Sequence, residues 1–292
     1  MRLSSSLFRR LASASLLVAL SGVLNVAAPP AAAVDTGAAR PTAVFTLEPY
    51  RKSIALRAVI AGRPGLFAFD TAGGLSLLTP QFADAIGCKP WGRLVGFQMM
   101  GDKIQTPQCT DLSVSIDAQR LPLPTAAVFD VMTLFPPDAP RLDGSLALDL
   151  FAGQAITIDF PARRLIVESA ESLRERTGKA TEFPARVSRE MQGRALAVSI
   201  GVPSAQGLVW MELDSGNGGT VLVSKPYAAL LGLDPEKTAP QPADFALGHG
   251  LRVAVPAAFT PEMIIDGNIG MPFLKDHVVT LDLAAGRLWL SR

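Results

Sequence analysis

The sequence predicts an all-β fold built from two homologous lobes, and three observations support this prediction. Residues 67–74 are echoed by residues 211–218, and each copy is a hydrophobic run that ends in an Asp followed by a small hydroxyl residue. The chain holds 25 Gly and 23 Pro among 292 residues, which favours short strands separated by turns. Few windows show helical periodicity. Closed or nearly closed barrels would remove the exposed strand edges of such lobes.

The first 33 residues have the layout of a signal peptide. Arg2, Arg9 and Arg10 form a basic start, an apolar run covers residues 11–26, and small residues fill positions 28–33. The alternative is a membrane anchor. Because the apolar run contains several polar residues and is short for a span of about 20 residues, the sequence favours a cleaved signal. We therefore expect a periplasmic or secreted protein without stable membrane insertion after cleavage.

The order of strands supports a duplication. In the first half, residues 54–60 read as a strand, and a Gly/Pro turn leads into a second strand that ends at Asp70. In the second half, residues 195–200 are followed by a similar turn and a strand that ends at Asp214. Each half therefore delivers one Asp from a buried strand into a loop.

These repeats divide the chain into lobes. We expect a first lobe over residues 34–167 and a second over residues 194–292. The segment 168–193 between them is rich in charge and low in apolar periodicity, so we interpret it as a linker with a short helix near its start.

A short helix is expected after each Asp. Thr79 and Pro80 provide an N-cap and a first-turn Pro, and Gly87 provides a stop. Ser224 and Pro226 repeat this scheme in the second half.

The spacing of the copies locates an insertion. Asp70 and Asp214 lie 144 positions apart (214 − 70), whereas the closing segments that begin at Asp143 and Asp266 lie 123 apart (266 − 143). The first half is therefore longer by 21 residues between its Asp and its closing segment. Insertions fall in loops more readily than in packed strands, which predicts a projecting hairpin or loop of different length in each half.

Charge and cysteine usage restrict the function classes. The 27 Lys and Arg nearly balance the 26 Asp and Glu, which argues against nucleic acid or an anionic membrane as a partner. In an exported protein Cys88 and Cys109 are candidates for a disulfide, although two buried thiols are the alternative. The two histidines, His249 and His277, lack metal-ligand spacing, so no metal site is expected.

At this point the residues resemble the retropepsin-like aspartic peptidases and their two-lobed pepsin-like relatives. Asp214-Ser215-Gly216 matches the Asp-Thr/Ser-Gly loop of these families, and Ile269-Gly270 matches their later hydrophobic-Gly segment. Asp70-Thr71 also fits, but Ala72 and Ala147 stand where Gly is usual. The resemblance covers residues 45–292 and implies two β-barrel lobes related by a pseudo-twofold axis, with a few short helices.

The resemblance also implies an activity, that of an endopeptidase without a cofactor, acting on peptides or proteins. Asp70 and Asp214 would hold one water and share one proton, because two close carboxylates do not both ionise readily. Thr71 and Ser215 would hydrogen-bond across to the opposite loop. Gly73 and Gly216 would support the pair of Asp residues through the backbone of the two loops.

A flap is expected to cover this site and to grip an extended peptide. We place it at residues 95–103, with Phe97, Met99 and Met100 as substrate-binding candidates. An ordinary exposed hairpin is the alternative. A shorter equivalent is expected in the second lobe around residues 245–251.

The departures at Ala72 and Ala147 leave three outcomes open: an active peptidase, a weak one, or a non-catalytic periplasmic protein that binds peptides on the same scaffold.

The positions after the Asp tripeptides, Gly73 and Asn217, lack the hydroxyl found in many pepsin-like members, which predicts activity in mildly rather than strongly acid conditions. The internal duplication predicts a monomer, with pairing of two chains as the alternative.

Overall fold

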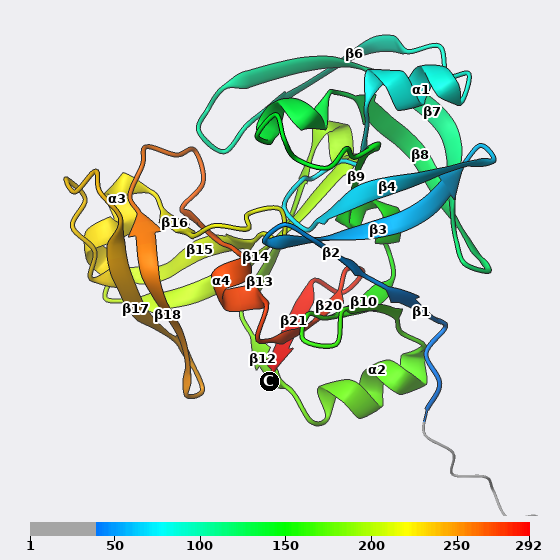
Figure 1. Cartoon of the computed structure of the whole chain (residues 1–292). Coiled ribbons are helices and arrows are strands. Elements are labelled where there is room, and N and C mark those ends of the chain that lie inside the picture. Colours follow the sequence, from blue (N-terminus) through cyan, green and yellow to red (C-terminus); the bar gives the residue numbers. More distant parts are fainter. Residues whose placement is uncertain (1–38) are drawn as a thin grey trace, which may run out of the picture. The chain divides into compact units, whose positions relative to one another are not determined.

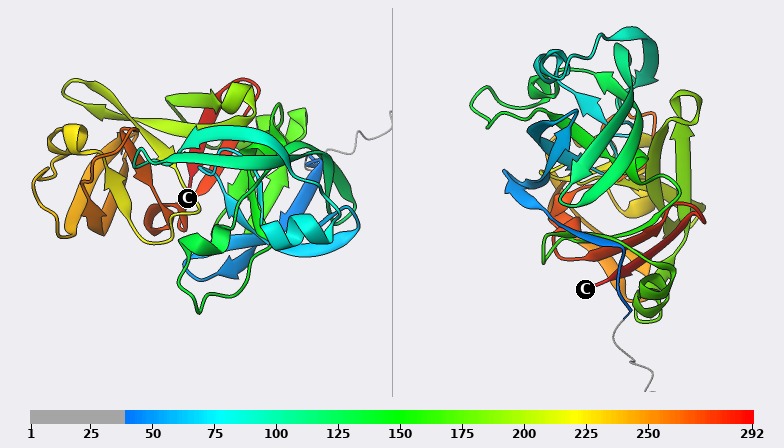
Figure 2. Two further views of the ribbon diagram at one scale, coloured as in Figure 1. Left: turned by 90° about the horizontal axis from the view of Figure 1, so that it is seen from above. Right: turned by 90° about the vertical axis from the view of Figure 1, so that its right-hand side faces the viewer.

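Figure 1 shows the computed structural model of the chain, which describes residues 39–292. The expected signal peptide, residues 1–33, lies outside the described residues. Strands dominate, and they form three sheets. One sheet belongs to each half of the sequence, and the third is assembled from both halves (Figures 1 and 2).

The first lobe is an eight-stranded sheet that curls until β3 also pairs with β7. Three short helical segments accompany it. Its strands are β2 (Glu48–Tyr50), β3 (Ser53–Ile60), β4 (Arg63–Asp70), β5 (Leu77–Leu78), β6 (Trp91–Phe97), β7 (Lys103–Ile116), β8 (Gln119–Val128) and β9 (Gly144–Ala147). Its helical segments are α1 (Pro80–Ala85), η1 (Val131–Leu134) and η2 (Leu148–Phe151).

The second lobe is a seven-stranded sheet with the same central strand order. Its strands are β13 (Ala185–Glu190), β14 (Ala195–Ser204), β15 (Gly207–Leu213), β16 (Val221–Val223), β17 (Gln241–Gly248), β18 (Leu251–Phe259) and β19 (Gly267–Ile269). Its helical segments are η3 (Met191–Gly193), α3 (Lys225–Ala228), η4 (Ala229–Leu231) and α4 (Met271–Leu274).

The third sheet joins the lobes. Its strands are β1 (Ala43–Thr46), β10 (Ala155–Asp159), β11 (Arg164–Val167), β12 (Thr181–Phe183), β20 (Val278–Asp282) and β21 (Arg287–Ser291). β10 of the first half pairs antiparallel with β20 of the second, and Thr157 faces Thr280 across this pair with their hydroxyl oxygens 2.9 Å apart. These two residues are 123 positions apart, which is the spacing of the closing segments. The pseudo-twofold axis that relates the two halves therefore passes between the equivalent residues Thr157 and Thr280.

The segment expected to be a linker contains regular structure. Residues 168–193 include α2 (Ala170–Thr177), β12, β13 and η3. α2 begins with a reciprocal cap between Ser169 and Ser172. β13 pairs with β14 over six residues, so the sheet of the second lobe begins before residue 194.

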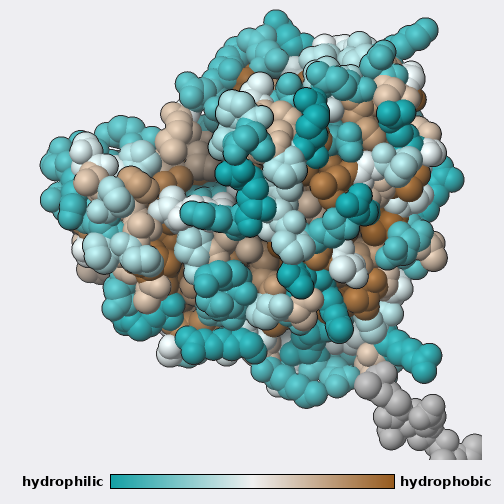
Figure 3. Space-filling view, in the orientation of Figure 1, coloured by the Kyte–Doolittle hydropathy of each residue, from teal (hydrophilic) through white to brown (hydrophobic). Residues whose placement is uncertain are grey.

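The two lobes share a packed interior. Alternating residues of the strands supply it, and Phe45, Phe67, Phe69 and Phe151 are among its largest fully buried side chains. On the face seen in Figure 3, hydrophilic and hydrophobic residues are interspersed. Within residues 39–292, no helix has the length and apolar character needed to cross a membrane.

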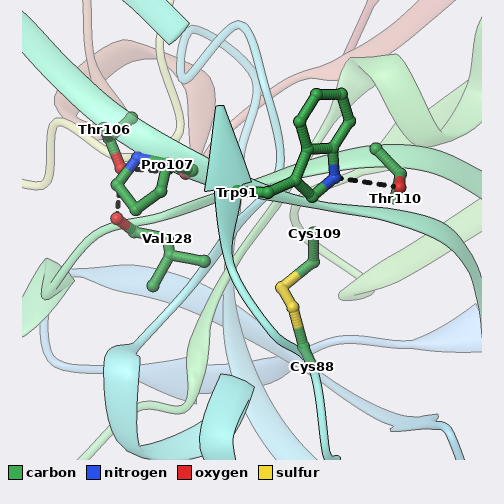
Figure 4. The surroundings of a disulfide bond; sticks show 7 residues. All are labelled: Cys88, Trp91, Thr106, Pro107, Cys109, Thr110 and Val128. Carbon is green, nitrogen blue, oxygen red and sulfur yellow. Dashed lines mark hydrogen bonds between the residues drawn. A yellow bond between two sulfur atoms is a disulfide. The ribbon is translucent and has the colours of Figure 1, made fainter. Parts of the chain in front are cut away.

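Cys88 and Cys109 form a disulfide, with Cα atoms 6.1 Å apart (Figure 4). The bond ties the segment after α1 to β7, beside Trp91, whose indole donates to the hydroxyl of Thr110. A bridge between residues 21 positions apart is worth about 3 kcal/mol in the chain-entropy account.

Candidate active site

Asp70 and Asp214 come from equivalent strands. β4 ends at Asp70 and runs parallel to β9, which also pairs antiparallel with β5. β15 ends one residue before Asp214 and pairs with β19 in the same way, and β19 pairs with β16. Each Asp therefore follows a central strand whose neighbours fix its direction, as the sequence repeat predicts.

Thr71 and Ser215 join the two loops. The Thr71 hydroxyl donates to Leu213 O over 2.6 Å and accepts from Ser215 N over 2.9 Å. The Ser215 hydroxyl donates to Phe69 O over 2.6 Å and accepts from Thr71 N over 3.1 Å. All four hydrogen bonds are buried, and each is worth about 1 kcal/mol net. This exchange is the one that the resemblance implies, and it fixes the separation of the two Asp residues.

The two carboxyl groups lie within hydrogen-bonding reach of each other. Asp214 is buried, whereas Asp70 keeps partial exposure. A Cβ added at Gly216 would come within 2.7 Å of Asp70 Oδ2, and one at Gly73 would lie 3.0 Å from the same carboxyl. The two predicted supporting glycines therefore permit the close approach of backbone to the Asp70 carboxyl.

The hydrogen bonds to the two carboxyls are unequal. Asp214 Oδ1 accepts from the backbone N–H groups of Gly216 and Asn217, over 2.7 and 3.0 Å. Its Oδ2 accepts from Nδ2 of Asn268 over 2.6 Å. Asp70 accepts only backbone hydrogen bonds among the described residues, from Ala72 and Gly73.

The pKa values of the pair follow from burial and from these contacts. Burial, and after it the neighbouring Asp214 carboxylate, raise the pKa of Asp70 to about 7. Burial also raises the pKa of Asp214, but the hydrogen bonds from Asn268, Asn217 and Gly216 oppose the rise. The pair titrates as a unit, and this asymmetry favours the negative charge on Asp214 and the proton on Asp70.

Asn268 was missed by the sequence analysis. It is fully buried on β19 and links Asp214 to Asn217, whose Nδ2 donates to Asn268 Oδ1 over 2.8 Å. The side chain of Asn217 therefore acts through Asn268 rather than on Asp214 directly. Ser145 holds the equivalent position in the first lobe, and its buried hydroxyl has no partner among the described residues. The available signal was the position of Asn268, a polar residue directly before the Ile269-Gly270 segment that matches the family pattern.

The departures in the first loop have a structural explanation. Ala72 does not adopt a positive φ, and Gly74 takes the left-handed conformation with φ +69°. A Cβ at Gly270 would come within 2.5 Å of the carbonyl oxygens of Asn217 and Thr220. Ala147, the equivalent residue, is fully buried with its methyl group in place, so the first loop follows a different path.

A half-buried carboxyl, that of Asp149, supports this different path. The Ser76 hydroxyl accepts from Ala147 N over 3.1 Å and donates to Asp149 over 2.7 Å. Burial raises the pKa of Asp149 to about 6, against the hydrogen bonds from Ser76 that lower it. Neither residue was singled out from the sequence, because their neighbours come from a distant segment.

The predicted flap is the hairpin between β6 and β7, and it reaches toward the second lobe (Figures 1 and 2). Phe97 and Met100 are 57% and 44% exposed, and Met99 is half-buried. The carbonyl of Met99 accepts a hydrogen bond from Ile264 N of the second lobe over 3.0 Å. On the other side, Gly96 lies against Met191, and a Cβ at Gly96 would overlap the Cε methyl group of Met191.

The prediction of an equivalent flap in the second lobe is wrong. β18 pairs parallel with β16 as β8 pairs with β5, so the β17–β18 hairpin corresponds to β7–β8 and not to β6–β7. Its tip carries His249, which packs edge-on against Phe183, with ring centroids 5.6 Å apart. The extra residues of the first half therefore include β6 and the predicted flap, and others lie between β8 and β9, where η1 stands.

Within the described part of the chain, no group of three or more His, Cys, Asp or Glu side chains is placed to hold a metal ion. A third acidic side chain, Glu212, lies close enough to Asp70 and Asp214 for their charges to raise its pKa. These three carboxyls are not arranged as metal ligands.

Comparison with known proteins gives the fold. No family model matches the chain, and no curated protein matches it. The crystal structure of basic 7S globulin from soybean is similar, with TM-score 0.56 and 9% identity over 85% of this chain and 94% of the globulin. The crystal structure of conglutin gamma from lupine seeds has TM-score 0.56 and 8% identity over 86% of this chain and 95% of that protein.

The fold is all-β, two-lobed and pepsin-like. This confirms the predicted fold class. At such low identity the similarity shows the fold alone, and both proteins are named as globulins rather than as peptidases.

Proposed function

We propose that the protein is an aspartic endopeptidase, which hydrolyses peptide bonds with a water activated between Asp70 and Asp214. One observation carries the proposal. The reciprocal hydrogen bonds of Thr71 and Ser215 hold two carboxyls within reach of each other, and one of them has a pKa raised to about 7. A pair of this kind retains one proton where a free Asp has lost it.

The asymmetry of the pair suggests the starting state. Asp214 carries the negative charge and accepts a proton from the water, whose oxygen attacks the carbonyl carbon of the substrate. Asp70 donates its proton to the carbonyl oxygen. The tetrahedral intermediate then collapses: its hydroxyl returns a proton to Asp70 as the carbonyl re-forms, and the C–N bond breaks as the amine leaves with the proton that Asp214 took from the water. One water is consumed, and the two carboxyls return to sharing one proton.

The flap supports a peptide as the substrate. The β6–β7 hairpin offers backbone groups that would pair with an extended chain, and Phe97, Met99 and Met100 offer apolar contacts to its side chains. No cofactor or metal is needed for this chemistry. The duplicated lobes already supply both carboxyls, so a monomer suffices.

We also propose that the protein is exported to the periplasm or secreted, with residues 1–33 as a cleaved signal peptide. The disulfide between Cys88 and Cys109 supports this, because such bonds persist in oxidising compartments.

A second candidate is a non-catalytic protein that binds peptides on the same scaffold. The observation that favours it is the similarity to two globulins that are not named as enzymes.

The test is cleavage of a peptide library, read by mass spectrometry between pH 3 and pH 8. Wild type is compared with Asp70→Asn, Asp214→Asn and the control Asp84→Asn, which changes an exposed Asp on α1. We expect cleavage by wild type and the control, and a loss of at least about 10³-fold in either dyad variant. If well-folded dyad variants cleave as wild type does, the peptidase proposal fails. If wild type binds the peptides without cleaving any, the binding protein is favoured.

A further inference from the structure

Glu212 lies beside the aspartic pair without being part of it. It stands two residues before Asp214 on β15, between the buried Met211 and Leu213. Side chains two apart on a strand point to the same face. Glu212 therefore shares a face with Asp214, and in the parallel pair with β19 it is in register with Asn268, which donates to Asp214.

The carboxyl of Glu212 is half-buried but still reaches solvent. Among residues 39–292 it has no ion-pair partner and accepts no hydrogen bond. Every charged group that acts on it is acidic: Asp214, Glu190 and Asp70. A carboxylate surrounded in this way is poorly satisfied, because both its burial and its neighbours oppose its charge.

One candidate cation on this face is engaged elsewhere. Arg186 on β13 shares this face through the register of Arg186 with Ser199 and of Ser199 with Glu212. Its guanidinium, however, stacks over the ring of Trp210 at 4.3 Å. Among residues 39–292, no cationic side chain is therefore paired with Glu212.

The equivalent position in the first lobe is apolar. Ala68 precedes Asp70 by two residues and is in register with Ser145, as Glu212 is with Asn268. Ala68 packs on a buried cluster formed by Tyr50, Ala55, Val131 and Leu142. The two sides of the aspartic pair thus differ in charge, although the backbone is duplicated.

We propose that Glu212 is a specificity-determining residue, which binds a cationic side chain, Lys or Arg, on the second-lobe side of the scissile bond. The first-lobe side, beside Ala68, takes a small or apolar side chain. This inference rests on the proposed function, because it assumes that an extended peptide lies across Asp70 and Asp214.

The proposal has a proton-linked signature. Burial, with the three neighbouring carboxyls, raises the pKa of Glu212 to about 8, so Glu212 holds a proton at pH 7 in the free protein. A cation placed against it favours the charged form and lowers this pKa. Binding of a Lys side chain at pH 7 should therefore release a proton from Glu212.

The experiment measures binding of uncleavable peptides to the full protein by calorimetry. The scissile –CO–NH– is replaced by –CH(OH)–CH₂–, and Lys or its uncharged analogue norleucine is placed on one side or the other of this group. We expect Lys to bind about tenfold tighter than norleucine on one side only. Repeating the titration at pH 7 in buffers of different ionisation enthalpy should show extra proton release with Lys.

Two variants assign the effect. Glu212→Gln should bring Lys and norleucine to within about twofold and abolish the extra proton release. Glu190→Gln, which changes an exposed neighbouring carboxylate, should keep the preference for Lys. Equal binding of the two peptides by wild type, including no binding of either, overturns the proposal, and so does a preference that survives in Glu212→Gln.

Cleavage of the matching ordinary peptides separates this inference from the peptidase proposal. A Glu212-dependent preference in binding, without cleavage, leaves this inference standing while the peptidase proposal fails. Cleavage without any preference for Lys supports the peptidase proposal and overturns this inference.

Discussion

Asn268 donates a hydrogen bond from its Nδ2 to Oδ2 of Asp214 over 2.6 Å. The equivalent residue of the first lobe, Ser145, makes no such contact with Asp70. This pair of positions breaks the symmetry of an otherwise duplicated site, and it biases which carboxyl carries the charge.

Under the proposed peptidase activity, replacing Asn268 with Ala should move the acid limb of the pH–rate profile to higher pH. The amide stabilises the ionised form of Asp214, so its loss raises the pKa of that carboxyl. A hydrogen bond to a charged group is worth about 1.5–3 kcal/mol, which corresponds to about 1–2 pH units. The profile of kcat/KM measures the shift, and Ser145→Ala is the matched control with no shift expected. An unmoved limb in Asn268→Ala would show that the amide does not tune the pair.

Stability should fall as the pH rises from about 4 to about 8. The pKa of Asp70 is near 7 in the folded protein and 3.8 when unperturbed, so between these values the native state binds more protons than the unfolded state. Asp149 and Glu212, with pKa values of about 6 and about 8, act in the same direction.

Asp70→Asn removes one of these charges and should raise Tm at pH 8 by roughly 2 °C or more, the shift that about 1 kcal/mol gives in a domain of this size. At pH 4 the two proteins should melt within about 1 °C of each other. Calorimetric melts at both pH values measure the difference, and an equal shift at both would rule out a proton-linked origin.

Much of the site follows from local sequence. The hydrophobic runs that end at Asp70 and Asp214 predict the delivery of both carboxyls, and the cap of Thr79 and Pro80 predicts α1. These features depend on neighbouring residues, so local patterns reveal them.

The role of Asn268 and the sheet between the lobes depend instead on pairing between distant segments. β10 pairs with β20, in which the facing residues Thr157 and Thr280 are 123 positions apart in the sequence. The residues of either strand do not indicate which strand it pairs with. The second-lobe flap was predicted wrongly for the same reason, because a hairpin pattern does not tell which hairpin of the other lobe it matches.

The backbone of the second loop should not accept a methyl group at Gly270. In Gly270→Ala the Cβ would lie 2.5 Å from two backbone carbonyl oxygens, which cannot move without disturbing the Asp214 loop. We expect a loss of about 3 kcal/mol or more in the free energy of unfolding. The matched change Ala147→Gly should cost only about 1 kcal/mol. Urea denaturation compares the two, and similar losses would mean that the loops are built alike.

Thr71→Ala should destabilise the fold and reduce the proposed peptidase activity together. It removes a donor to Leu213 O and an acceptor for Ser215 N, both buried, at a cost of about 1–3 kcal/mol. Thr71→Ser keeps the hydroxyl and should retain most of the stability and most of kcat. If Thr71→Ala keeps full activity at a temperature where it remains folded, the hydroxyl exchange is not what sets the separation of the two carboxyls.

The sharing of one proton by Asp70 and Asp214 is tested most directly by following the Cγ resonances of ¹³C-labelled Asp through a pH titration, with Asp70→Asn and Asp214→Asn for assignment. In wild type we expect Asp70 to titrate near pH 7, and its midpoint to fall by at least about one unit in Asp214→Asn, where the neighbouring charge is gone. A midpoint near pH 4 in both proteins would contradict the account, because the two carboxyls would then ionise independently.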